Sequence, residues 1–278
     1  MTSSTTRKSP DIGIIIIGDE ILSGKRADKH LAKFIELLAE RGLQLSWAEY
    51  VGDSPERITS TLSRAFASGD MVVSCGGIGA TPDDHTRQCA AKALGVELSL
   101  QPEAKALILE RMRETAAEQG VAFEPDRHDN VHRLNMGMFP EGAGIIQNPY
   151  NKIPGFTCKG QGLGEVHFVP GFPVMAWPMM QEKLDAYCQT WGQAAQRIEK
   201  SVIVFGAMEA SLTPLMQLIE DNHPGVKVFS LPSVDHPQLG KHIELGVKGA
   251  LENANEAYAA LLAGLHEFKV KLGAELVR

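Results

Sequence analysis

An apolar run near the amino-terminus constrains the fold of this chain most. Ile12–Ile17 carries isoleucine at every position except Gly13. Continuous β-branched sequence is typical of strands that are buried on both faces of a parallel sheet, whereas half-exposed strands alternate. The run is far shorter than the roughly 20 residues that a membrane-spanning helix needs. It therefore predicts a central strand with helices packed against both of its faces.

Strand and helix patterns alternate downstream of this run. Repeated strand–helix–strand units predict a mainly parallel sheet that is covered by helices on both sides, which makes the fold class α/β. The spacing of apolar residues predicts further strands at 44–51, 71–75, 144–147 and 165–169, and helices at 26–41, 53–66, 81–94, 102–119, 127–136 and 173–191.

A second, smaller domain is expected after residue 192. Residues 192–196 resemble a linker, and the pattern beyond them predicts strand, helix, strand, strand, helix, ending at Leu272. This order is typical of a small α+β (β-α-β-β-α) domain. We therefore expect a disordered tail at 1–10, a large domain at 11–192 and the small domain at 197–278.

Composition excludes several classes of function. The chain has 27 basic and 34 acidic residues, a formal charge of −7, whereas a broad nucleic-acid-binding surface shows a basic excess. Nucleic acid is therefore not an expected partner. No signal-peptide core follows the first residues, so we expect a cytoplasmic protein without a membrane partner.

Cysteines and histidines give no familiar metal or nucleophile motif. The four cysteines are scattered without CxxC spacing, so neither a disulfide framework nor a structural zinc site is expected. The nine histidines include no HExxH motif, and we expect no histidine pair to act as metal ligands. No GxSxG elbow is present, which leaves covalent nucleophilic hydrolysis unsupported.

A glycine-rich turn at Gly76–Gly79 follows the strand at 71–75 and precedes a helix expected to start at Thr81. Glycines let a backbone approach a ligand closely, and free N–H groups at a helix start favour an anion. The sequence matches neither the GxxxxGK[ST] phosphate loop nor GxGxxG. It therefore predicts either a phosphate-binding loop or only a tight strand-to-helix turn.

Acidic residues accompany this turn. Thr81 and Asp84 have capping-box spacing, and Asp53, after the strand at 44–51, suits a helix N-cap. Yet Asp83 and Asp84 would repel a phosphate at the same place unless a cation lay between them. A hard ion such as Mg²⁺ binds one or two carboxylates together with phosphate oxygens. Asp53, at the same sheet edge, could then be a third ligand.

The order of five motifs resembles one known family. Gly76–Thr86 resembles the TGGxGPTxDDxT signature of the molybdenum-cofactor-biosynthesis domain in its CinA-type (competence/damage-inducible) branch. Gly18–Gly24 resembles the first loop of that branch, and Val51–Asp53 its VGD turn. Segments from Asn148 to Phe156 and Pro170–Pro173 resemble its NP…PGF…LPGVP series. The resemblance covers about residues 11–190, with Ala80 in place of a usual proline.

This resemblance implies a three-layer αβα domain that binds molybdopterin or a nucleotide-like ligand across the strand ends. It also implies divalent-metal-dependent cleavage of a pyrophosphate, with ADP-ribose as the type of substrate, and a homo-oligomer (a dimer or trimer). The 278 residues do not include the amidase domain that full-length proteins of the branch carry, so amidase activity is not expected of them.

We therefore expect a metal-dependent nucleotide pyrophosphatase. The alternative is a protein that binds molybdopterin or a nucleotide without turning it over. The expected catalytic and metal-binding residues are Asp53, Asp83 and Asp84. The expected ligand- or phosphate-binding residues are Gly76, Gly77, Gly79, Thr81, Asp19, Glu20, Pro170 and Gly171.

Overall fold

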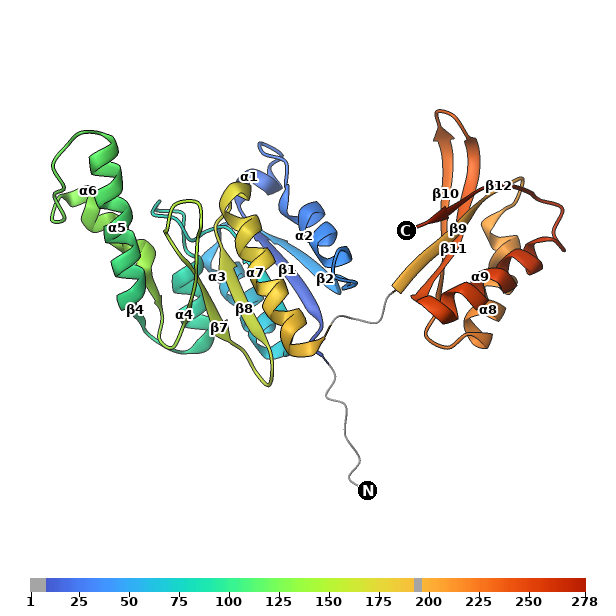
Figure 1. Ribbon diagram of the computed structural model, residues 1–278, viewed down its shortest axis with the longest axis horizontal. Coiled ribbons are helices and arrows are strands. Elements are labelled where there is room, and N and C mark those ends of the chain that lie inside the picture. Colours follow the sequence, from blue (N-terminus) through green and yellow to red (C-terminus); the bar gives the residue numbers. More distant parts are fainter. Residues whose placement is uncertain (1–8, 193–196) are drawn as a thin grey trace, which may run out of the picture. The chain divides into compact units, whose positions relative to one another are not determined.

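The computed structural model describes residues 9–192 and 197–278, and the chain divides after Gly192 into two compact units (Figure 1). Residues 1–8 of the expected tail and 193–196 of the expected linker lie outside the described residues. Pro10 is anchored rather than tail-like, since its carbonyl oxygen accepts a 2.6 Å hydrogen bond from the hydroxyl of Tyr187. The first unit thus includes a residue that the sequence assigned to the tail.

A six-stranded sheet forms the centre of the first unit (Figure 1). Across the sheet the strands are β2 (Trp47–Val51), β1 (Ile12–Ile17), β3 (Met71–Cys75), β8 (Glu165–Val169), β7 (Gly155–Lys159) and β6 (Gly144–Ile146). The pairs β1–β2, β1–β3 and β3–β8 are parallel, whereas β7 and β6 add antiparallel strands at one side. The prediction of a mainly parallel sheet is confirmed.

Helices cover both faces of this sheet. They are α2 (His30–Ala39) and α7 (Pro173–Trp191) on one face, and α3 (Pro55–Ser68) and α4 (Thr86–Leu94) on the other. Because successive strand residues point to opposite faces, β1 supplies two cores. Ile14 and Ile16 pack on the α2 and α7 side, and Ile15 and Ile17 on the α3 and α4 side. This explains why β1 is apolar almost throughout and confirms the three-layer α/β fold.

Several short elements complete the first unit. They are α1 (Asp19–Leu22), β4 (Leu98–Leu100), α5 (Pro102–Glu118), α6 (His128–Leu134), the 3₁₀ turn η1 (Asn135–Gly137) and β5 (Met138–Pro140). The sequence missed β4, β5 and β7. β4 and β5 have three residues each and pair only with one another, far along the chain, so no local periodicity reveals them.

Two expected helix starts are wrong. α2 begins at His30 rather than at 26, because the Asp28 carboxylate accepts hydrogen bonds from the N–H groups of His30 (2.8 Å) and Leu31 (3.1 Å). α4 begins at Thr86 rather than at Thr81. The expected contact between Thr81 and Asp84 exists, but it closes an isolated turn ahead of the helix.

The second unit is a four-stranded antiparallel sheet with two helices. Its elements are β9 (Arg197–Phe205), α8 (Glu209–Asn222), β10 (Lys227–His236), β11 (Gly240–Ala250), α9 (Leu251–Leu265) and β12 (Lys271–Val277). The strand order is β10-β11-β9-β12. The predicted β-α-β-β-α order therefore lacked its last strand. The helix expected to reach Leu272 ends at Leu265, and Leu272 lies in β12 opposite Val204 of β9.

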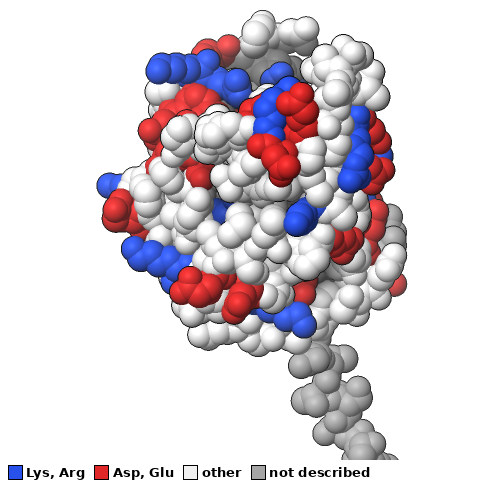
Figure 2. Space-filling model, turned by 90° about the vertical axis from the view of Figure 1, so that its left-hand side faces the viewer, with Lys and Arg blue, Asp and Glu red and all other residues white. Residues whose placement is uncertain are grey.

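No helix within residues 9–192 and 197–278 is long and apolar enough to cross a membrane. On the face drawn in Figure 2, acidic and basic side chains are interspersed. Nucleic-acid binding calls for a basic stripe or patch, which this face of the described chain does not present.

Phe156 carries much of the packing between the sheet and the α3–α4 layer. Its ring stacks on Phe139 and Phe168 with centroid distances of 4.6 and 4.3 Å, and all three are buried. We predict that Phe156→Ala lowers the free energy of unfolding by about 3–5 kcal/mol, because it leaves a cavity. Urea denaturation of the purified protein measures this loss. The exposed Phe172→Ala should change stability little, and an equal loss in both variants would contradict the prediction.

Candidate functional site

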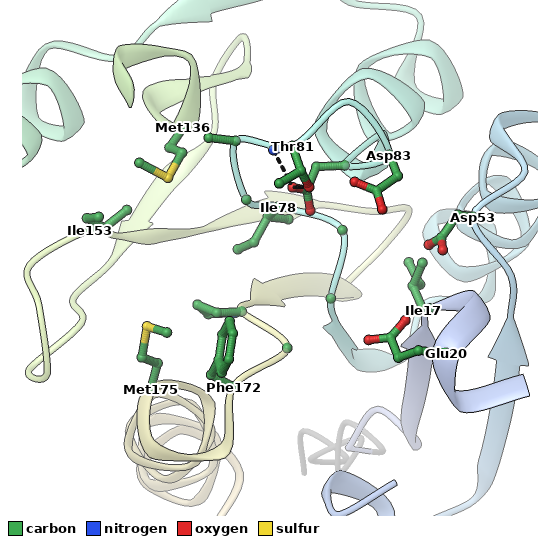
Figure 3. Close-up of a pocket in the computed structure, with 18 of the residues that line it drawn as sticks. Ile17, Glu20, Asp53, Ile78, Thr81, Asp83, Met136, Ile153, Phe172 and Met175 are labelled. Carbon is green, nitrogen blue, oxygen red and sulfur yellow. Dashed lines mark hydrogen bonds between the residues drawn. The ribbon is translucent and has the colours of Figure 1, made fainter. Parts of the chain in front are cut away.

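The carboxyl ends of β1, β3 and β8 open into a cavity of about 450 Å³ (Figure 3). Ligands of parallel α/β sheets bind at this edge. Of the residues that the sequence predicted, those that line the cavity are Glu20, Asp53, Gly76, Gly77, Gly79, Thr81, Asp83, Asp84, Pro170 and Gly171. Asp19 is the exception, because it lines a different hollow.

The glycine loop is held by the first two residues of α4. The Thr86 hydroxyl donates to the carbonyl oxygen of Gly76 at 3.1 Å, and the Thr86 N–H donates to that of Gly77 at 3.0 Å. The Arg87 guanidinium donates to the carbonyl oxygens of Ile78 and of Gly79, the latter at 2.7 Å. Four consecutive carbonyl groups are thus bonded to α4 and cannot face a ligand.

The N–H groups of the same loop are differently placed. Within the described chain, those of Gly77, Ile78, Gly79 and Ala80 have no protein acceptor. Successive free N–H groups of this kind form an anion-binding nest. The N–H groups of Gly76 and Thr81 are not available, since they donate to Val169 (3.1 Å) and to the Asp84 carboxylate (2.8 Å). Of the four expected backbone donors, Gly77 and Gly79 remain.

Glycine is required at the start of this loop by the turn itself. Gly76 and Gly77 have φ angles of +101° and +68°, which side chains disfavour. A Cβ on Gly77 would lie 2.1 Å from the Thr86 hydroxyl oxygen, and one on Gly76 would lie 2.4 Å from the Ile17 carbonyl oxygen. The tight-turn explanation of the glycines is therefore correct, and it is compatible with anion binding by the N–H groups further on.

Carboxylates form one wall of the cavity. Figure 3 shows Glu20, Asp53 and Asp83 on the same side of it, beside the glycine loop. Burial raises the pKa of Asp53, a hydrogen bond from Asp19 opposes this, and the charges of Asp19, Glu20 and Asp83 raise it further. Such a concentration of like charge favours a bound cation or a proton.

Asp19 and Asp53 hold each other in place. The Asp19 N–H donates to Oδ2 of Asp53 at 2.9 Å, and the Asp53 N–H donates to Oδ1 of Asp19 at 3.1 Å. A Cβ on Gly52 would lie 2.4 Å from Oδ1 of Asp19, which explains the glycine of the Val51–Asp53 turn. Asp53 is not the N-cap of α3 as expected; Ser54 is, and its hydroxyl accepts from Arg57.

A divalent cation would find few direct ligands here. Among the described residues, no three Asp, Glu, His or Cys side chains are grouped as a ready metal cage. Mg²⁺, however, typically takes one or two carboxylates and completes its shell with water and phosphate oxygens. The carboxylate oxygens of Asp53 and Asp83 fit that donor chemistry, whereas Oδ2 of Asp84 already accepts from the N–H and hydroxyl of Thr81.

The opposite wall is apolar, and the sequence did not identify it. Figure 3 shows Met136, Ile153, Phe172 and Met175 across the cavity from the carboxylates. The sequence gives only a weak indication of this wall, because its residues lie beside Gly- and Pro-rich turns on three separate segments of the chain. A flat ring fits such a wall better than a charged group does.

A rigid loop supports the apolar wall. Asn148 is buried, and its amide nitrogen donates to Oδ1 of Asn151 (2.7 Å) and to the Ile153 carbonyl (2.9 Å). Lys152 has a φ of +63°, and its ammonium group contacts Glu110 and Glu114 of α5. Lys152 thus links this loop to α5.

Comparison with known proteins identifies the first unit. Residues 13–190 match the family model described as a probable molybdopterin binding domain. The chain belongs to this family. A CinA-like protein of Citrifermentans bemidjiense is 31% identical over 209 residues, which are 74% of this chain and 47% of that protein. The match to this relative, together with the motifs, places the chain in the CinA-type branch of the molybdopterin-binding family.

Other relatives cover nearly the whole chain. A protein of Pyrobaculum calidifontis is 31% identical over 255 residues, which are 91% of this chain and 93% of that protein. The crystal structure of CinA from Thermoplasma acidophilum, a protein of unknown function, aligns with a TM-score of 0.54 at 27% identity. It covers 64% of this chain and 98% of that one.

Arg87 offers a test of how the glycine loop is held. Arg87→Met keeps the length and apolar stem of the side chain but leaves the carbonyls of Ile78 and Gly79 without donors. We predict a loss of about 1–3 kcal/mol in unfolding free energy, the cost of unpaired buried polar groups. Urea unfolding gives the value, and hydrogen exchange at residues 76–80 should accelerate. Lys92→Met, at the other end of α4, is the control; similar effects from both would contradict the assignment.

Proposed function

We propose that this chain is a divalent-metal-dependent hydrolase that cleaves the pyrophosphate bond of a nucleotide of the ADP-ribose type. One observation supports the proposal above others: the loop residues whose N–H groups have no acceptor among the described residues line the same cavity as the carboxylates. N–H groups suit phosphate oxygens, and carboxylates suit the cation that pyrophosphate chemistry uses. A site for a neutral ligand would need neither.

The loop would hold the diphosphate. In this proposal the N–H groups of Gly77, Ile78, Gly79 and Ala80 bind its oxygens, and the buried Arg87 keeps the loop carbonyls turned away. The positive charge of Arg87, close behind the loop, adds to the attraction. Such preorganised donors stabilise the charge that develops on a phosphoryl group during transfer.

Asp53 and Asp83 would hold the metal ion, with Asp84 beside them. When bound, a divalent ion neutralises phosphate charge and lowers the pKa of a water ligand. Asp53, whose carboxylate accepts from the Asp19 N–H, would take the proton of the attacking water. The water oxygen bonds to one phosphorus, and the bond from that phosphorus to the bridging oxygen breaks. From ADP-ribose the products are AMP and ribose 5-phosphate.

The apolar wall would receive the flat ring of the ligand. Met136, Ile153, Phe172 and Met175 face the carboxylates across the cavity, so one end is suited to an aromatic ring and the other to phosphate (Figure 3). A pterin ring meets the same requirement as an adenine. The second candidate function is therefore molybdopterin or nucleotide binding without turnover, which the family match favours.

Homo-oligomer formation and a cytoplasmic location stay predictions. Both come from the sequence and its family resemblance. Sedimentation of the purified chain would test the first, and fractionation of the source cells the second.

Turnover separates the two functions. We predict that the protein releases AMP from ADP-ribose with Mg²⁺, Mn²⁺ or Co²⁺ and that chelation stops the reaction. Asp53→Asn should lower kcat at least about 100-fold, because it removes a metal ligand and base, while ADP-ribose binding persists. Asp185→Asn, a surface aspartate paired with Arg41, is the control and should leave kcat unchanged. No turnover by the native protein with any of these metals, beside measurable binding, would leave the non-catalytic function.

The pH profile tests the role of Asp53 directly. Without metal its pKa is raised above the ordinary 3.8, so protons compete with the metal ion for this carboxylate, and at limiting metal concentration the acid limb of activity should lie at a higher pH than for an unperturbed aspartate. Removing a neighbouring negative charge favours ionisation, so Glu20→Gln should move this acid limb of kcat/KM to lower pH. The measurement is the rate of AMP release across the acid range. A limb that stays in place or moves upward would rule out Asp53 as the titrating group.

A further inference from the structure

A pair of histidines on α6 lies outside the cavity and has no part in the proposed hydrolysis. His128 and His132 are one helical turn apart, and both are exposed. Their Nε2 atoms are 3.3 Å apart and their ring centroids 4.4 Å apart. Two histidines at i and i+4 of a helix share one face, as in helical zinc motifs.

The separation of the two nitrogens matches one coordination geometry. Zn–N bonds are about 2.0–2.1 Å long, so two nitrogens on a tetrahedral ion are about 3.3–3.4 Å apart. The Nε2 atoms of His128 and His132 already stand at 3.3 Å. A zinc ion could therefore bind both imidazoles without movement of the helix, after the two rings turn so that both Nε2 lone pairs point at it.

The neighbouring arginines bond to groups other than the two histidines. The Arg127 guanidinium bonds both carboxylate oxygens of Asp129, at 2.5 and 2.8 Å, and Arg133 donates to Oδ1 of Asn130 at 3.3 Å. Both cations are thus engaged with groups other than the histidines. Asn130 is buried and donates to the Glu124 carbonyl, which orients the helix so that the histidines face solvent.

We propose that His128 and His132 form a zinc site. The two imidazoles supply two ligands, and water or a further donor completes the shell. Zinc across one turn also stabilises α6, which is only 7 residues long and so marginal as an isolated helix. Since α6 leads directly into η1, whose Met136 lines the cavity, the site lies one turn from the apolar wall.

Zinc titration of the whole chain by calorimetry tests the proposal. Excess Mg²⁺ is present throughout to occupy oxygen-ligand sites at the cavity. We expect one zinc per chain that is lost on acidification, because protons compete for the same nitrogens. His128→Gln and His132→Gln should each weaken binding at least about tenfold, since the second ligand of a chelate binds at high effective concentration. His266→Gln, an exposed histidine at the end of α9, is the control and should change nothing.

A second variant tests whether the two histidines bind one zinc ion together or each bind zinc separately. His132→Gln combined with Arg133→His keeps the number of histidines but moves one off the shared face of the helix. It should bind zinc as weakly as the single variants do. Native affinity in this variant, or equal zinc binding by the native protein and by a variant lacking both histidines, would overturn the proposal. Neither result bears on the hydrolase, whose test is AMP release.

Discussion

The hydrogen bonds that Thr86 and Arg87 make to the glycine loop decide what the sheet edge can bind. A loop with its carbonyl groups toward the cavity would attract cations and repel phosphate. Here the carbonyls of Gly76–Gly79 are bonded to α4, and the free N–H groups are those of Gly77–Ala80. Arg87 achieves this at a cost, since burial lowers its pKa and disfavours its charge. The buried positive charge therefore favours an anion at the loop, whereas its burial opposes folding.

The carboxylate wall adds negative charge to the same cavity. Asp53 has a raised pKa because burial and three neighbouring carboxylates disfavour its charge. Groups held in unfavourable electrostatic surroundings often mark functional sites, although structural networks also produce them. Here the alternative of a helix cap fails for α3, since Ser54 caps that helix. The Asp53 carboxylate instead accepts a hydrogen bond from the Asp19 N–H at the start of α1. The side-chain oxygen of an asparagine could accept the same bond. The need for a charge at this position is thus not explained by the fold.

How far the sequence predicts this molecule depends on the range of each interaction. The run at β1 predicts the layered fold because a two-sided core leaves its mark within a few residues. The glycine loop and its acids could be predicted because they too lie within one short stretch of sequence. The Asp19–Asp53 pair and the strands β4, β5 and β12 depend on partners far along the chain, which no local pattern reports. Arg87 stands in the motif, but its role depends on a loop shape that the sequence does not show.

The apolar wall illustrates the same limit in energetic terms. Lys152 adopts a left-handed backbone, which costs a residue with a side chain about 1–2 kcal/mol. Its ion pairs with Glu110 and Glu114 are solvent-exposed, so water and salt weaken them. They cannot by themselves hold the loop. The buried Asn148 amide, with two hydrogen bonds across the same turn, is the stronger constraint. The shape of the apolar wall is therefore set mainly by Asn148, a residue that the family motif contains, and only adjusted by Lys152.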